Sequence, residues 1–177
     1  MSTTKWSIDS MHSEIGFKVK HMMITNVNGT FGSFTAEAET NSDDFSAAKI
    51  SFSAKVDSIK TGVADRDGHL LSDDFFNAEK YPNITFKSTS FTKKGEEAFV
   101  LTGELTIRDV TKSVSLDVEY AGIVKDPYGQ TKAGFAVTGK IKRSDFNLKW
   151  SAVTEAGSVV VADEIKINCE VQLIKQA

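Results

Sequence analysis

Alternation of apolar and polar side chains is the feature that most limits how this chain can fold. Between residues 50 and 57, Ile50, Phe52, Ala54 and Val56 alternate with Ser, Lys and Asp side chains. A period of two turns successive side chains to opposite faces, which is typical of a strand with one buried face. Seven further segments repeat this pattern, around residues 15–19, 24–37, 84–86, 99–107, 114–120, 135–141 and 165–173.

The connections between these segments indicate how the strands pair. Lys93–Glu96 and Asp126–Gly129 contain turn-forming residues and are short enough for hairpins. Short connections produce antiparallel neighbours, because parallel pairs need long crossovers. Eight or so long antiparallel strands must curl or split into two sheets. A closed barrel is favoured because it removes exposed strand edges, and a two-sheet sandwich is the alternative.

One segment, residues 61–81, departs from the alternation. Leu71 and Phe75 have the i, i+4 spacing of a helical face, and aspartates stand near the candidate helix starts. Pro82 ends the segment before the next strand. We therefore predict one or two short helical turns at one end of an all-β, eight-stranded antiparallel barrel.

Length and composition exclude several classes of protein. The 177 residues are close to the size of one domain, so we expect residues 1–177 to form a single domain. A net charge of −3 argues against a nucleic-acid-binding surface, and one cysteine excludes an intrachain disulfide. The polar N-terminus and the absence of a run of roughly 18 apolar residues predict a cytoplasmic protein without stable membrane insertion.

The interior of such a barrel can be of two kinds. Eight strands enclose a space that side chains fill or that holds one small ligand. The inward positions are almost all Ile, Val, Leu and Phe, so water would find few hydrogen-bonding partners there. A large dry void would cost too much stability. A packed core and a long apolar guest both satisfy these conditions.

The sequence contains no recognisable catalytic or metal-binding pattern. His12, His21 and His69 are too few and too scattered for a zinc motif. Ser13 follows His12, but neighbours on a strand face opposite sides and cannot form a nucleophile–base pair. The chain also lacks a nucleophile elbow, a phosphate-binding loop and a dinucleotide fingerprint. We expect a binding protein, with no catalytic residue, metal or cofactor.

Polar side chains near the strand ends are candidates for contact with a ligand head group. His21 is in phase with the apolar residues of its strand, so it points inward near the strand end. Arg66 and His69, with Asp67 between them, suit an anionic or hydroxylated group. Each also has a structural interpretation, as a hydrogen-bonded histidine or as an ion pair with helix capping.

A series of short motifs covers nearly the whole chain. The most distinctive are Arg66–Phe76 and Tyr81–Thr89. The others, in chain order, are Trp6–Ser13, Ile15–Met22, Val27–Phe34, Val56–Gly62, Leu105–Lys112 and Arg143–Phe146. Together they resemble the YceI family, also described as lipocalin-like polyisoprenoid-binding proteins. Where that family often has Asp-Phe-Gly, this chain has Asp145-Phe146-Asn147, and Asn tolerates the left-handed conformation that Gly would supply.

The resemblance implies an extended lipocalin-like barrel that binds an isoprenoid or similar long-chain lipid for storage, transport or sequestration. The family has no established catalytic chemistry, its members are often dimeric, and the signal peptide of many members has no counterpart here. A homodimer is therefore one assembly that the resemblance allows. The implied head-group contacts are His21, Arg66, Asp67 and His69. The implied tunnel wall consists of Phe17, Phe52, Phe86, Phe99, Leu101, Leu116, Val118, Phe135, Ile167 and Val171.

Two other functions are compatible with the sequence. A ligand-free packed barrel could act as a stress-response or interaction protein. A hydrolase or isomerase could act on a lipid held in the tunnel. Uptake of a lipid would distinguish a lipid-binding barrel from a packed one. Turnover of the bound lipid would distinguish an enzyme from a binding protein.

Overall fold

A computed structural model describes residues 3–22, 24–41, 45–148 and 161–176. The helical elements are η1 (Val56–Ser58), α1 (Ala64–Leu70) and η2 (Arg143–Phe146). The strands are β1 (Thr4–Ile8), β2 (Glu14–His21), β3 (Thr25–Phe31), β4 (Phe34–Thr40), β5 (Lys49–Lys55), β6 (Ile59–Lys60), β7 (Asn83–Lys93), β8 (Ala98–Ile107), β9 (Val110–Lys125), β10 (Thr131–Lys142) and β11 (Val161–Lys175).

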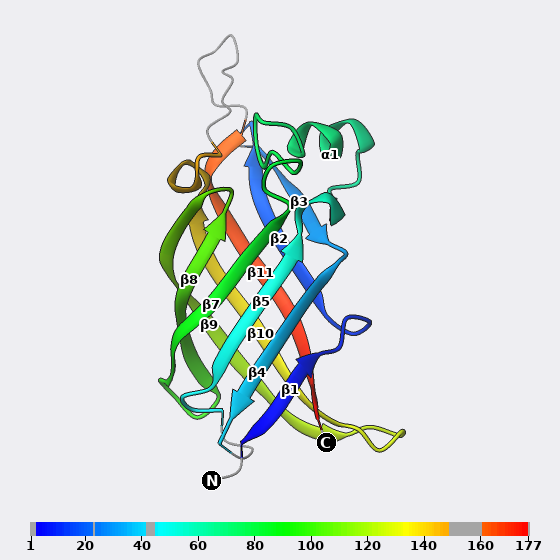
Figure 1. The fold of residues 1–177 in the computed structure, drawn as a ribbon, viewed down its shortest axis with the longest axis vertical. Helices are drawn as coiled ribbons and strands as arrows, with labels where there is room; N and C mark the ends of the chain where they lie inside the picture. The colour runs from blue at the N-terminus through cyan, green and yellow to red at the C-terminus, as the bar shows by residue number, and fades with distance from the viewer. Residues whose placement is uncertain (1–2, 23, 42–44, 149–160, 177) are drawn as a thin grey trace.

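The strands form a closed antiparallel barrel with eight positions (Figure 1). Strands β7 to β11 follow one another as neighbours, and β1 joins β4 on one side and β11 on the other. The pairing of Trp6 with Lys175 belongs to this closing contact. The predicted eight-stranded barrel is therefore confirmed, and the sandwich alternative is wrong, because closure leaves no free edge on the ring.

Three of the eight positions are occupied by interrupted strands. β1 and β2 both pair with β11, β3 and β4 follow each other, and β5 continues through η1 into β6. The single strand predicted over residues 24–37 is therefore two strands, β3 and β4. At their junction the Gly32 amide donates to the Ser58 carbonyl at 3.0 Å, and the Lys55 amide donates to the Ser33 carbonyl at 2.9 Å. The backbone stays hydrogen-bonded where the strand direction changes.

The predicted turns and the helical segment are confirmed. Lys94 and Gly95 donate to the Ala98 carbonyl in the β7–β8 hairpin, and the Asp126 amide donates to the Gln130 carbonyl in the β9–β10 hairpin. Helix α1 lies at the end of the barrel opposite the chain termini (Figure 1). Asn147 adopts the left-handed conformation, with φ of 61°, after η2.

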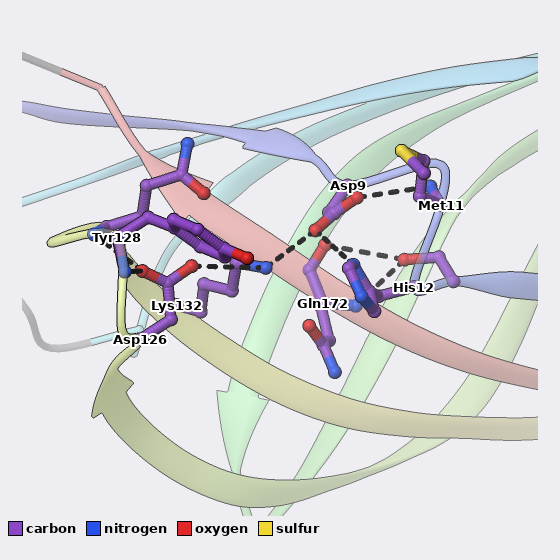
Figure 2. A network of polar contacts seen from close by, with 9 residues as sticks. Asp9, Met11, His12, Asp126, Tyr128, Lys132 and Gln172 are labelled. Atoms are coloured by element: carbon purple, nitrogen blue, oxygen red, sulfur yellow. Dashed lines mark hydrogen bonds and ion pairs between the residues drawn. The ribbon is translucent and has the colours of Figure 1, made fainter.

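A polar network ties the junction of β1 and β2 to the β9–β10 hairpin (Figure 2). The Lys132 ammonium lies 2.8 Å from Asp9 Oδ2 and 3.5 Å from Asp126 Oδ2, and His12 Nδ1 lies 2.8 Å from the same Asp9 oxygen. Lys132 donates a hydrogen bond to Asp9 and thereby lowers the pKa of that carboxyl to about 2. Asp9 therefore stays ionised and holds the two segments together over the whole neutral range.

Candidate functional site

The barrel encloses a cavity of about 240 Å³ whose surface consists almost wholly of apolar atoms. Inward-facing side chains from strands around the barrel contribute to its wall. On β11 the lining residues alternate from Ile165 to Leu173, as a strand with one inward face requires. At ~3.3 Å per residue, this row is about 26 Å long along the strand. The cavity is therefore elongated and suits a chain-shaped molecule.

Aromatic rings fill the cavity end next to the chain termini. Phe45, from the β4–β5 connection, contacts Trp6, Tyr120 and Phe135. Phe91 and Phe99 stack beside them, and ring centroids throughout this cluster are 4.6 to 6.4 Å apart. Trp6 Nε1 donates to Thr40 Oγ1 at 3.2 Å, which satisfies the buried indole. We refer to these six rings as the aromatic plug.

The segment that follows α1 covers the other end of the cavity. Phe76 lines the cavity and meets the Phe31 ring edge-on, with centroids 6.4 Å apart. Arg108, from the β8–β9 turn, donates to the main-chain carbonyls of Asp73 at 2.8 Å and Phe75 at 2.6 Å. These contacts hold the segment against the barrel rim, and Phe75 and Phe76 are buried beneath it. The α1 end is thus covered by a short helical segment, whereas aromatic side chains from strands and the β4–β5 connection fill the opposite end.

A glycine allows one large side chain to fit inside the barrel. Phe17 on β2 lies directly opposite Gly29 on β3. A Cβ atom at Gly29 would overlap the Phe17 ring. The ring therefore occupies the space in which any other residue at position 29 would place its side chain. Phe17 lines the cavity and packs against Phe31, with ring centroids 5.8 Å apart.

The size of the cavity has an energetic consequence. At ~24 cal/mol per Å³, 240 Å³ without a guest corresponds to about 6 kcal/mol of lost stability. This is a large share of the roughly 5–15 kcal/mol by which domains are stable. Water would regain little of it, because the wall offers few polar partners. An apolar guest recovers part of this energy, so the cavity favours such a guest.

The sequence-predicted wall residues lie where the alternation indicates. All ten except Phe99 line the cavity. Phe99 is buried and stacks on Phe91, which does line it, with 4.6 Å between ring centroids. The prediction missed Phe31, Phe45, Phe76 and Phe91 among the lining residues.

The predicted head-group residues lie around the α1 end but are not part of the cavity wall. His21 ends β2 and is half-buried. Arg66 donates from Nε to Thr61 Oγ1 at 2.8 Å and from Nη2 to the Thr61 carbonyl at 2.7 Å, while Asp67 accepts from the Thr61 amide at 2.9 Å. His69 Nε2 lies 2.8 Å from Asp74 Oδ2. Arg66 and Asp67 thus stabilise the start of α1 through Thr61.

Two other titratable groups near the cavity are buried. Cys169 lines the cavity, and burial raises the pKa of its thiol to about 11. Arg143 donates to the carbonyls of Leu148 at 2.7 Å, Ala162 at 2.9 Å and Val161 at 3.0 Å, which fixes η2 to β11. Burial lowers the pKa of this guanidinium. Both groups therefore act in the packing of the barrel wall rather than as free reactive groups.

The described residues contain no group of three or more His, Cys, Asp or Glu that could hold a metal ion. His12 lies against Asp9, whereas Ser13 Oγ accepts from the Gln172 amide at 2.9 Å. In the same parts of the chain, no helix is long and apolar enough to cross a membrane.

Comparisons with known proteins agree with this architecture. A family model described as a YceI-like domain matches residues 6–173. A UPF0312 protein of Photorhabdus laumondii is 43% identical over 149 residues, which cover 82% of this chain and 75% of that protein. The crystal structure of the Campylobacter jejuni YCEI protein is 38% identical, with a TM-score of 0.77 over 96% of both chains.

A more distant structure shares the fold. A polyisoprenoid-binding domain from Saccharophagus degradans is 15% identical, with a TM-score of 0.67 over 97% of this chain and 98% of that one. At this identity the similarity extends to the barrel architecture alone.

Proposed function

The chain belongs to the YceI-like domain family, and we propose that it binds one isoprenoid or similarly long-chain amphiphilic lipid inside its barrel, for storage, transport or sequestration. The observation that carries this proposal is the elongated cavity with an almost wholly apolar wall. Such a wall stabilises a hydrocarbon chain in proportion to the apolar area removed from water, and its described residues offer a polar substrate few hydrogen-bonding partners. A domain described as polyisoprenoid-binding has a barrel of the same fold.

The proposed orientation follows from the difference between the two ends of the cavity. The aromatic plug fills one end, so the hydrocarbon tail would point toward it. The polar head would remain at the α1 end, near His21 and His69, with Arg66 and Asp67 close by. A head group that engages Arg66 or Asp67 must compete with Thr61, which already bonds to both side chains.

We propose binding without catalysis, by a single domain. The pairing of His12 with Asp9 and of Ser13 with the main chain gives neither side chain a nucleophile–base partnership. A cytoplasmic location and a homodimeric state complete the proposal. Cell fractionation tests the location, and light scattering coupled to size-exclusion chromatography tests the assembly.

A blocking variant tests the proposal. Leu101 lines the cavity, whereas Glu104 on the same strand is exposed on the outside of the barrel. Leu101→Trp should abolish uptake of a fluorescent polyprenol analogue, because the indole takes up cavity volume. Glu104→Trp, the matched control, should bind like the wild type. Equal uptake by a folded Leu101→Trp variant would contradict the proposal, and so would failure of the wild type to take up any long-chain lipid.

A further inference from the structure

The outer surface of the barrel carries a row of lysines near its α1 end. Lys140 on β10 lies directly opposite Lys166 on β11, and Lys166 lies opposite Lys18 on β2. Their strand neighbours Ile141, Ile165 and Phe17 line the cavity, so the lysines face outward. Residues directly opposite on antiparallel strands have Cβ atoms about 4.5–5.5 Å apart. Three positive charges therefore lie abreast, an arrangement that is unfavourable within a sheet.

Further lysines extend this row toward the end of the barrel. Lys20 is two residues beyond Lys18, and Lys142 is two residues beyond Lys140. Lys60 on β6 lies opposite Thr30 on β3, which lies opposite Gly16 on β2, so Lys60 adds a charge beside the row. All are exposed. We name these side chains the lysine patch, which consists of Lys18, Lys20, Lys60, Lys140, Lys142 and Lys166.

Two acidic side chains, Asp163 and Glu164, lie beside the lysine patch, and Glu164 is directly opposite Lys142. Lys140 has Glu164 at 4.0 Å, and Lys142 acts electrostatically on Asp163. Over the described part of the chain, no carboxylate lies within 4.0 Å of the other four ammonium groups. Six lysines beside two carboxylates leave the patch positive on a chain whose net charge is −3. The segment that contains α1 carries the opposite charge, with exposed carboxylates at Asp65, Asp73 and Asp74, so the lysine-bearing wall is the surface suited to anionic lipids.

Exposed apolar side chains lie at the same end of the barrel. Ile24 and Met22, in the turn between β2 and β3, are 78% and 40% exposed, and Val63, just before α1, is 47% exposed. The Ile24 amide donates to the His21 carbonyl at 3.2 Å, and Met22 has a φ of 54°, which bulky side chains rarely adopt. The turn thus presents apolar side chains to solvent at a cost in backbone strain. Figure 1 shows this turn and α1 at the same end of the barrel.

We propose that the α1 end of the barrel docks on an anionic lipid bilayer. The lysine patch would contact lipid phosphates, and Met22, Ile24 and Val63 would enter the interfacial layer. Charge alone would also suit a nucleic acid, but a nucleic acid would leave these apolar side chains without a partner. Docking in this orientation brings the α1 end of the cavity, where the proposed head group lies, next to a store of long-chain lipids. The inference adds a docking surface to the proposed function.

Vesicle binding tests the proposal, with an oligonucleotide as competitor. Wild-type protein is sedimented with phosphatidylcholine vesicles and with vesicles that also contain phosphatidylserine. The patch variant Lys18→Gln/Lys20→Gln/Lys166→Gln should bind the anionic vesicles about 100-fold more weakly, from the loss of three cationic contacts. A control variant with the same charge change, Lys49→Gln/Lys93→Gln/Lys125→Gln, should stay within about 3-fold of the wild type, because these lysines lie outside the patch.

Several results would overturn the proposal. Equal binding to both vesicle types, equal losses in the two variants, or tighter binding to the oligonucleotide than to vesicles would each do so. Circular dichroism checks the fold of the variants. Wild-type binding should also weaken as salt is added, and a salt-independent interaction would refute the role of the lysines without any variant. These assays measure vesicle binding and not cavity occupancy, so docking can fail while lipid binding inside the barrel holds.

Discussion

Removing a guest from the cavity should lower the thermal stability of the barrel by an amount that the cavity size predicts. The full 240 Å³ corresponds to about 6 kcal/mol at ~24 cal/mol per Å³. A chain-shaped guest that fills half of this volume would recover about 3 kcal/mol. For a protein of this length, 1 kcal/mol shifts the melting temperature by about 2–4 °C. Loading should therefore raise Tm by about 6–12 °C.

Scanning calorimetry on delipidated and reloaded protein measures this shift. Organic extraction on a hydrophobic resin removes the lipid, and incubation with a polyprenol restores it. Leu101→Trp, in which an indole already occupies part of the cavity and uptake is lost, should show no such shift in Tm. The reasoning would be refuted by protein whose loading is verified by mass spectrometry but whose Tm does not change. An equal shift in Leu101→Trp would refute it as well.

Three further predictions concern the barrel frame. Gly29→Ala should cost about 1–3 kcal/mol in urea unfolding, because its methyl group meets the Phe17 ring; an unchanged midpoint would contradict the close contact. Asp9→Asn should cost about 1–2 kcal/mol at neutral pH through the lost charge-assisted bond to Lys132. The pKa of Asp9 is about 2 in the folded protein and ordinarily 3.8, so the extra stability of the wild type over Asp9→Asn should be complete above about pH 4 and should disappear as the pH falls toward 2; a pH-independent difference would contradict this. Cys169, with a pKa of about 11, should react with a thiol reagent at pH 8 only after unfolding, and rapid reaction of the folded protein would show that the wall is open.

The barrel could be predicted from sequence because one physical signal repeats along the chain. Alternation determines which side chains point inward, and closure follows from the short hairpins and the cost of free edges. The strand break at Gly32 is a feature that alternation does not reveal. Alternation continues through residues 24–37, while the break between β3 and β4 depends on hydrogen bonds to Ser58 and Lys55, which are distant in sequence.

Irregularities in the strands explain why some wall residues were missed. On β7 the pairing with β8 shifts between Ser88 and Ser90, so an extra residue changes which side chains face inward. Phe86 and Phe91 therefore both line the cavity although their numbers differ in parity. Phe45 lies in a connection between strands, where no periodicity operates. The sequence therefore carries no local signal that places either Phe45 or Phe91 in the cavity wall.

The predicted head-group residues show why residue chemistry alone does not identify a ligand contact. The chemistry of Arg66 and Asp67 suits a head group, but in the structure both side chains bond to Thr61 and stabilise the start of α1. Charged side chains in a short helical segment bond to nearby backbone as readily as to a ligand. Which polar side chains meet depends on the pairing of strands that are distant in sequence. The same pairing brings Lys18, Lys166 and Lys140 into one row.

Native mass spectrometry of the purified protein, followed by organic extraction, tests the central claim most directly. The proposal predicts one long-chain apolar molecule per chain, which extraction releases and accurate mass identifies as an isoprenoid or a related lipid. A chain that carries nothing, and that takes up neither a polyprenol nor a long-chain fatty alcohol on incubation, would contradict it.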